Sequence, residues 1–176
     1  MSFGQSKFIP DSTVNSILAL RSPKTIEKFS SRVLDSLPVN EFASSFLYEE
    51  QPFVLFINSN RTEFLMAIIH EGTYKLYFSE FKIGYLCYDS LINSDIKYIQ
   101  TPYTSFYTES GLKLGIKIDN VMDVKGSSAT YTNDNLCYCY NSIDSEFVIY
   151  GECEYFLRCI IKNDIVVKIE YGYTSL

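Results

Sequence analysis

The sequence predicts an α+β protein made of two tandem units, each a short helix followed by an antiparallel meander. The two halves close on similar strand-like segments, Phe81–Tyr85 and Ile169–Tyr173, which lie 88 residues apart. Their opening segments align at an offset of 95, where Ile17 matches Leu112. Apolar residues follow a strand period over most of the chain and a helical period in two short stretches. An internal sequence repeat of this kind indicates the architecture of a protein and leaves its chemistry open.

The first unit is expected to span residues 1–86. Residues 14–20 alternate and predict a strand. Ser22 is a good N-cap and Pro23 suits a first helical position, so a helix is expected to begin here and to end by Pro38. The apolar residues that define its face are Ile26, Phe29, Val33 and Leu34.

A meander of three strands follows in the first unit. The strands are predicted over residues 53–57, 62–69 and 74–85, with a bulge near Ser79. Polar turns separate them at residues 58–61 and 71–73. This part of the chain is the strongest evidence for an antiparallel sheet.

Residues 87–107 are interpreted as a connection, and residues 108–176 as the second unit. A strand over Leu112–Leu114 and a helix over 118–125, ended by Gly126, open this unit. Its later strands are predicted over residues 136–140, 147–150, 154–162 and 165–173. Asn163 and Asp164 tolerate positive φ and form the expected two-residue loop between the last two strands. Short helices of this kind need a sheet to dock on.

The composition fits a folded, acidic protein. The chain has 176 residues, 47% of them apolar, with 15 Tyr, 13 Phe and no Trp. The net charge of −6 and the absence of a Lys/Arg cluster argue against binding to a nucleic-acid backbone. An acidic surface favours a basic partner, although the same charge would also serve solubility alone.

The N-terminal residues and the cysteines indicate a reducing, cytoplasmic setting. The first seven residues have neither a basic stretch nor an apolar one, and no run is long enough for a membrane span. A periplasmic location is the alternative if a leader has been removed. The five cysteines are too few for a disulfide scaffold, so reduced thiols are expected; they are Cys87, Cys137, Cys139, Cys153 and Cys159.

The segment Thr108–Val121 resembles the opening of the β-lactamase inhibitory protein-like fold, which also occurs in small outer-membrane assembly lipoproteins. Gly115 and Val121 match the family pattern, whereas Lys117 stands where a Ser or Thr cap is expected. The chain is also similar to uncharacterised bacterial proteins in two sequence motifs, Thr108–Gly115 and Ile161–Val166. The resemblance implies protein binding through an exposed sheet and its loops, and it brings no catalytic residues.

The residue types and their spacing favour a protein without catalytic activity, metal or cofactor. His70 is the single histidine, so a Ser-His or Cys-His pair would have to include it. Four cysteines could hold zinc only by converging from several strands, and their spacing fits no zinc motif. An enzyme with its site in the connection around residues 86–108 is kept as a third hypothesis.

The favoured hypothesis is a bacterial immunity protein that neutralises a secreted toxin. Tyrosine supplies contact area and carboxylates steer a basic partner, so the predicted contact surface combines both in the second unit. Its residues are Tyr138, Tyr140, Asp144, Glu146, Tyr150, Glu152, Glu154 and Tyr155. Each of these tyrosines could instead belong to the core. The alternative function is an envelope or lipoprotein-like assembly module whose leader has been removed.

Overall fold

The described part of the chain folds mainly into β-strands. The computed structural model describes residues 10–16, 18–19, 38–44, 50–71, 76–88, 95–132, 134–140 and 155–173. More than half of these residues lie in strands, and they contain one α-helix. The expected α+β class with two tandem helix-plus-meander units is therefore wrong. The helix predicted after Ser22 and the strand predicted over 147–150 fall outside the described residues.

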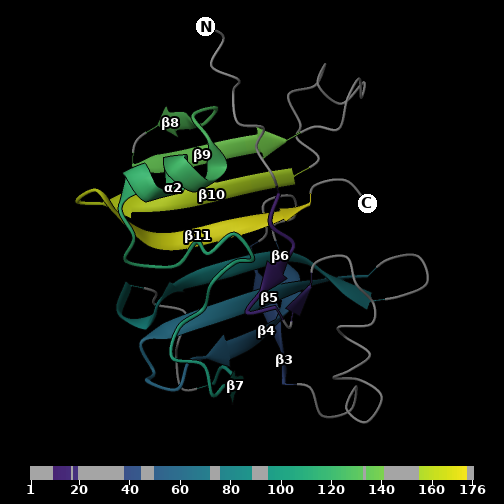
Figure 1. Cartoon of the computed structure of the whole chain (residues 1–176). Coiled ribbons are helices and arrows are strands. Elements are labelled where there is room, and N and C mark those ends of the chain that lie inside the picture. Colours follow the sequence, from purple (N-terminus) through teal and green to yellow (C-terminus); the bar gives the residue numbers. More distant parts are fainter. Residues whose placement is uncertain are drawn as a thin grey trace, which may run out of the picture.

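One nine-stranded sheet forms the body of the protein (Figure 1). Its main path is β3-β4-β5-β6-β11-β10-β9-β8, with antiparallel neighbours throughout, and β7 pairs in parallel with β4. The strands are β3 (Val39–Ala43), β4 (Gln51–Ile57), β5 (Glu63–Glu71), β6 (Leu76–Tyr85), β7 (Tyr98–Gln100), β8 (Thr130–Thr132), β9 (Asn135–Tyr140), β10 (Tyr155–Lys162) and β11 (Ile165–Tyr173). The smaller elements are a hairpin of β1 (Thr13–Val14) and β2 (Leu18–Ala19), a 3-10 turn η1 (Leu86–Tyr88) and the helix α2 (Ile118–Lys125).

The halves of the chain join through β6 and β11, the two segments that the offset of 88 had aligned. These strands pair antiparallel, with Ile83 opposite Ile169 and Lys82 opposite Glu170. Lys82 and Glu170 are themselves 88 residues apart. Because the equivalent strands hydrogen-bond to each other, the strands of both halves form one continuous sheet.

Two predicted irregularities of the sheet have clear positions in the structure. Ile68 pairs with Glu80 and Ile69 with Phe78, so Ser79 is the extra residue of the predicted bulge. A second bulge, not expected, skips Val167, since Ile160 pairs with Lys168 and Ile161 with Val166. This shift places Val166, rather than Val167, on the core face. The loop at Asn163 and Asp164 has φ of 51° and 61°, as predicted.

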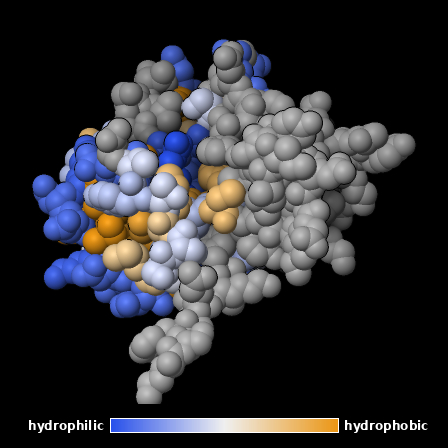
Figure 2. Space-filling view, turned by 90° about the horizontal axis from the view of Figure 1, so that it is seen from above, coloured by the Kyte–Doolittle hydropathy of each residue, from blue (hydrophilic) through white to orange (hydrophobic). Residues whose placement is uncertain are grey.

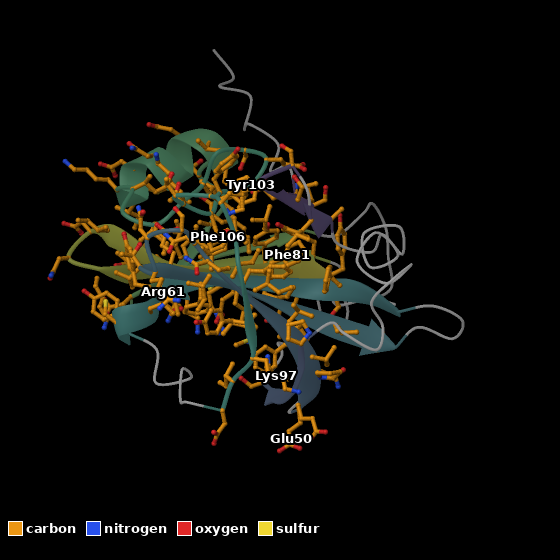
Figure 3. All side chains as sticks on the ribbon, turned by 90° about the horizontal axis from the view of Figure 1, so that it is seen from below. Glu50, Arg61, Phe81, Lys97, Tyr103 and Phe106 are labelled. Carbon is orange, nitrogen blue, oxygen red and sulfur yellow. The ribbon has the colours of Figure 1, made fainter. Side chains whose placement is uncertain are left out.

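The first face of the sheet carries the main core. The β1–β2 hairpin, the chain from residue 101 to residue 117, and α2 all lie over this face (Figure 1). Phe81 and Phe106 lie between the sheet and this cover, while Glu50, Arg61 and Lys97 are at the periphery (Figure 3). Apolar residues of the cover join the core, namely Val14, Leu18, Phe106, Leu112, Leu114 and Val121.

The second face combines an apolar cluster with a charged group. Phe53, Leu55 and Phe64 belong to the apolar cluster under β4 and β5. Near the junction of β6 and β11, Lys168 lies 3.2 Å from the buried carboxylate of Glu170, and Arg158 also binds that carboxylate. Burial raises the pKa of Glu170, but the neighbouring Lys168, Arg158 and Lys82 outweigh this, and the net pKa is lowered.

The helix α2 is fixed to the N-terminal segment by a buried ion pair. Lys117 is the N-cap residue of the helix but makes no side-chain capping hydrogen bond. At the C-terminal end, Gly126 has φ 85° and donates its N–H to the Met122 carbonyl at 2.7 Å. Lys125 Nζ lies 2.7 Å from Asp11 Oδ2, and both side chains are at most 2% exposed. The contact ties residues 114 positions apart in the sequence.

The surface around α2 is mixed in polarity. Seen from above, hydrophilic side chains surround an apolar area (Figure 2). Large apolar side chains that are exposed on this half include Val124, Tyr131 and Ile165. None of the helices in the described part of the chain is long and apolar enough to cross a membrane.

Candidate functional site

The predicted contact surface of the second unit is only partly described, and two of its tyrosines are buried. The Tyr138 hydroxyl donates to the Gly126 carbonyl at 2.8 Å, and burial raises the pKa of Tyr138 to about 12. Tyr155 is fully buried, and its hydroxyl accepts a bond from the Asp11 N–H at 3.1 Å. Burial raises the pKa of Tyr155 well above its usual value. Both residues are therefore core residues rather than contact residues.

The side chains of the other six members lie outside the described part of the chain. Tyr140 pairs with Tyr155 across β9 and β10, and its side chain lies outside the description. Five further members fall outside the described residues: Asp144, Glu146, Tyr150, Glu152 and Glu154.

A different segment, Tyr98–Tyr107, has the features of a functional site, and we call it the tyrosine segment. It covers part of the first face next to the β1–β2 hairpin (Figure 1). Four of its ten residues are aromatic: Tyr98, Tyr103, Phe106 and Tyr107. The side chains of Tyr98 and Tyr107 are each 41% exposed, whereas Phe106 is buried.

Backbone pairing with β4 and the following turn positions the first part of the tyrosine segment. Tyr98 and Gln100 lie opposite Leu55 and Ile57 in the parallel β4–β7 pair. The Thr101 N–H then donates to the Ile57 carbonyl at 2.8 Å, and the Ser59 N–H donates to the Tyr103 carbonyl at 2.7 Å.

Asn58 is the central side chain that connects this segment to the β4–β5 turn. It is fully buried, and its amide nitrogen donates to the Thr104 carbonyl at 2.8 Å and to Thr62 Oγ1 at 3.0 Å. Its oxygen accepts the N–H groups of Thr62 and Glu63 at 2.8 and 3.0 Å. The buried amide thus uses all its hydrogen-bonding capacity: three bonds stay within the β4–β5 turn, and the bond to Thr104 joins this turn to the tyrosine segment.

Glu63 and Asn15 hold the second part of the segment. Glu63 Oε2 accepts the Phe106 N–H at 2.9 Å. The pKa of Glu63 is raised, because the effect of burial exceeds the lowering effects of this hydrogen bond and of Lys113. Asn15 has φ 49°, a conformation that Asn tolerates better than most residues. Its side chain accepts the Tyr107 N–H at 3.0 Å and donates to the Ser105 carbonyl at 3.1 Å.

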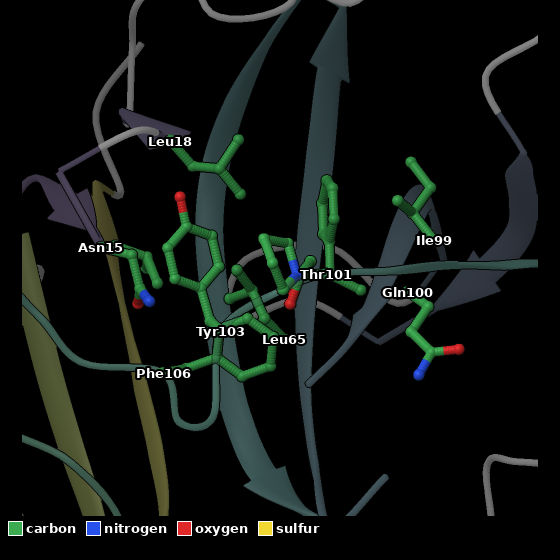
Figure 4. Close-up of a pocket in the computed structure, with 11 residues that line it drawn as sticks. Asn15, Leu18, Leu65, Ile99, Gln100, Thr101, Tyr103 and Phe106 are labelled. Atoms are coloured by element: carbon green, nitrogen blue, oxygen red, sulfur yellow. The ribbon is translucent and has the colours of Figure 1, made fainter. Parts of the chain in front are cut away.

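An apolar pocket of about 220 Å³ lies between the tyrosine segment, the hairpin and the sheet (Figure 4). Its walls are Val14, Asn15, Leu18, Phe56, Leu65, Ile99, Gln100, Thr101, Pro102, Tyr103 and Phe106. None of these lining residues carries a carboxylate, an amine, an imidazole or a thiol. The pocket is therefore suited to binding apolar groups rather than to acid–base or nucleophilic chemistry.

A second hollow, of about 230 Å³, has a mixed lining that includes Tyr88, Lys162 and Lys168. Its lysines already have partners, because Lys162 Nζ lies 4.6 Å from the centre of the Tyr88 ring and Lys168 pairs with Glu170. The first pocket is thus the better candidate for a binding site.

The residues considered for metal or nucleophilic chemistry do not gather in the described structure. His70 lies on β5 opposite Tyr77, and the described cysteines Cys87, Cys137, Cys139 and Cys159 have free thiols. Within the described ranges, no three His, Cys, Asp or Glu side chains are placed to hold a metal ion.

Comparisons with known proteins do not assign the chain to a family. No protein-family model matches it, and searches of curated proteins and of solved structures likewise found no match.

Proposed function

We propose that this chain is a non-catalytic binding protein and that the tyrosine segment contacts another protein. The observation that carries the proposal is the display of two half-exposed tyrosines, Tyr98 and Tyr107, on a segment fixed to the sheet by hydrogen bonds. Tyrosine is enriched at protein interfaces because it offers a large contact area and a polar tip at a low cost in conformational entropy.

The rigidity of the segment supports this role. Association costs free energy when loops and side chains must be ordered on binding. Here the carbonyls of Tyr103, Thr104 and Ser105 all accept hydrogen bonds from residues outside the segment. A partner would therefore meet a surface that is already formed.

The chemistry of the partner is inferred from charge. A net charge of −6 attracts a basic protein and speeds its association. The most specific version of the proposal is a bacterial immunity protein whose partner is a basic toxin domain. The acidity of the chain supports this version.

The proposal predicts that Tyr98→Ala and Tyr107→Ala weaken partner binding. Each truncation of a central interface tyrosine is expected to lower affinity about tenfold or more, which corresponds to about 1.4 kcal/mol. The partner to test is the protein encoded by the neighbouring gene, and the readouts are calorimetric affinity and rescue of growth on co-expression.

Tyr131→Ala is the matched control, because Tyr131 is an exposed tyrosine on β8 at the opposite end of the sheet. It should bind and rescue like the unmodified protein. Rescue that survives both Tyr98→Ala and Tyr107→Ala would remove the tyrosine segment as the contact surface. A neighbouring gene product that neither binds nor inhibits growth would contradict the immunity version.

A further inference from the structure

The apolar pocket is large enough for a ligand of its own. An engineered protein cavity of about 150 Å³ lined by Leu, Ile and Phe stays dry and binds benzene. The pocket between the hairpin and the tyrosine segment measures about 220 Å³ and has a lining of the same character. Its size therefore suits a compound with one or two rings.

The polar atoms of the lining limit what such a ligand can be. The side-chain oxygen and nitrogen of Asn15 both bond to the tyrosine segment, and the Thr101 hydroxyl donates to the Ile57 carbonyl at 3.1 Å. The Gln100 amide nitrogen donates to the Ser59 carbonyl at 3.3 Å. Since no charged side chain lines the pocket, a charged ligand would lose its hydration without compensation.

Tyr103 supplies the polar group that is available to a ligand. Its ring forms part of the pocket wall and extends toward Leu18 (Figure 4). No described residue makes a hydrogen bond to the Tyr103 hydroxyl. A ligand with one donor or acceptor could therefore bond to it while the rest of the ligand contacts apolar side chains such as Phe56 and Leu65.

We infer that this pocket binds a small, uncharged, mainly apolar ring compound, with its one polar group on the Tyr103 hydroxyl. This site goes beyond the proposed function, because it requires no protein partner and uses none of the exposed faces of Tyr98 and Tyr107. It adds a second class of ligand to the same segment of the chain.

The test is to titrate the free protein with toluene, p-cresol, indole and benzoate and to monitor each titration by NMR. Indole and p-cresol are expected to bind with Kd below about 1 mM, a range that compounds of this size can reach. The amide signals of Thr101 and Phe106 should shift. Benzoate, which has the ring of toluene and a negative charge, should not bind. Absence of binding by all four probes, or binding of benzoate as tight as that of toluene, would overturn the inference.

Two variants locate the site. Ile99→Trp fills the pocket and should weaken indole binding at least about tenfold, whereas Ile165→Trp, at an exposed position on β11, should not. Tyr103→Phe should keep toluene binding and remove the preference for p-cresol over toluene. Circular dichroism checks that each variant is folded, and Tyr103→Phe still tests the site if Ile99→Trp does not fold. Equal binding by Ile99→Trp and the unmodified protein would contradict the assignment. If the protein partner displaced indole competitively, the natural occupant of the pocket would be a side chain of that partner, and the inference of a small-molecule ligand would be overturned.

Discussion

Replacing Lys125 with methionine is expected to destabilise the protein by about 3–5 kcal/mol, the usual cost of removing one partner from a buried ion pair. The reason is that Asp11 stays buried beside Tyr155 while its cation is lost. The carboxylate would keep its bonds from the Ser110 N–H and hydroxyl, at 3.0 and 2.8 Å, but these do not neutralise its charge. At about 2–4 °C per kcal/mol for a domain of this size, the midpoint of thermal unfolding should fall by about 6–20 °C.

Two further variants make this prediction specific to the pair. Lys117→Met removes an exposed lysine just before the same helix and should change stability by no more than about 0.5 kcal/mol. The double variant Asp11→Asn with Lys125→Met leaves no unpaired charge, because both ionic side chains are replaced by neutral ones. The asparagine oxygen can still accept the Ser110 N–H. It should be more stable than Lys125→Met alone. A double variant whose losses are simply additive would show that the two side chains are not coupled.

Gly172→Ala is expected to cost about 3 kcal/mol, at the upper end of the usual range for overpacking a core. A Cβ at this position would lie 2.5 Å from the Ser79 carbonyl oxygen and 3.0 Å from the Glu80 Cα. Both atoms belong to the β6 backbone, which cannot move aside without opening its pairing with β11. Chemical denaturation followed by circular dichroism measures the loss.

Gly84→Ala is the matched comparison, since the offset of 88 relates Gly84 to Gly172. A Cβ at Gly84 would lie 2.6 Å from the nearest carbon of the Phe64 ring, which is the end of a side chain and can turn. We expect Gly84→Ala to be destabilising, but less so than Gly172→Ala. The reverse order would mean that the backbones of β6 and β11 are not packed this closely.

The sequence allowed accurate prediction of elements that local patterns determine. Alternating or continuous apolar runs located β4, β5, β6, β9, β10 and β11 to within a few residues. The helix α2 and its Gly126 end were also located, because apolar spacing and a C-terminal glycine act within one short segment. The bulge at Ser79 and the loop at Asn163 and Asp164 followed from the same local reasoning.

The fold class could not be predicted because it depends on contacts far apart in the chain. The repeat showed that two strands are alike, but not that they pair with each other, as Lys82 and Glu170 do. Strands of two or three residues, such as β7 and β8, are too short for a periodic signal and form by pairing with longer neighbours. Three residues of the segment predicted as a connection, those of β7, therefore belong to the sheet.

Two residues of the predicted contact surface are buried for a related reason. Tyr138 and Tyr155 were interpreted as contact residues, but strand alternation does not tell which face a distant cover will bury. Here α2 and the N-terminal segment cover that face. A signal for the tyrosine segment was present in the four aromatic residues between 98 and 107. The pocket itself could not be seen in the sequence, since its walls come from segments about 90 residues apart.

Hydrogen exchange in the free protein tests most directly whether the tyrosine segment is a preformed binding site. The amides of Thr101, Phe106 and Tyr107 donate to the Ile57 carbonyl, the Glu63 carboxylate and the Asn15 side chain. With no partner or ligand present, these three amides should exchange nearly as slowly as the amides in the middle of β4 and β5. Exchange at the rate of an unstructured peptide would show that the segment is not held in place, and it would contradict the account.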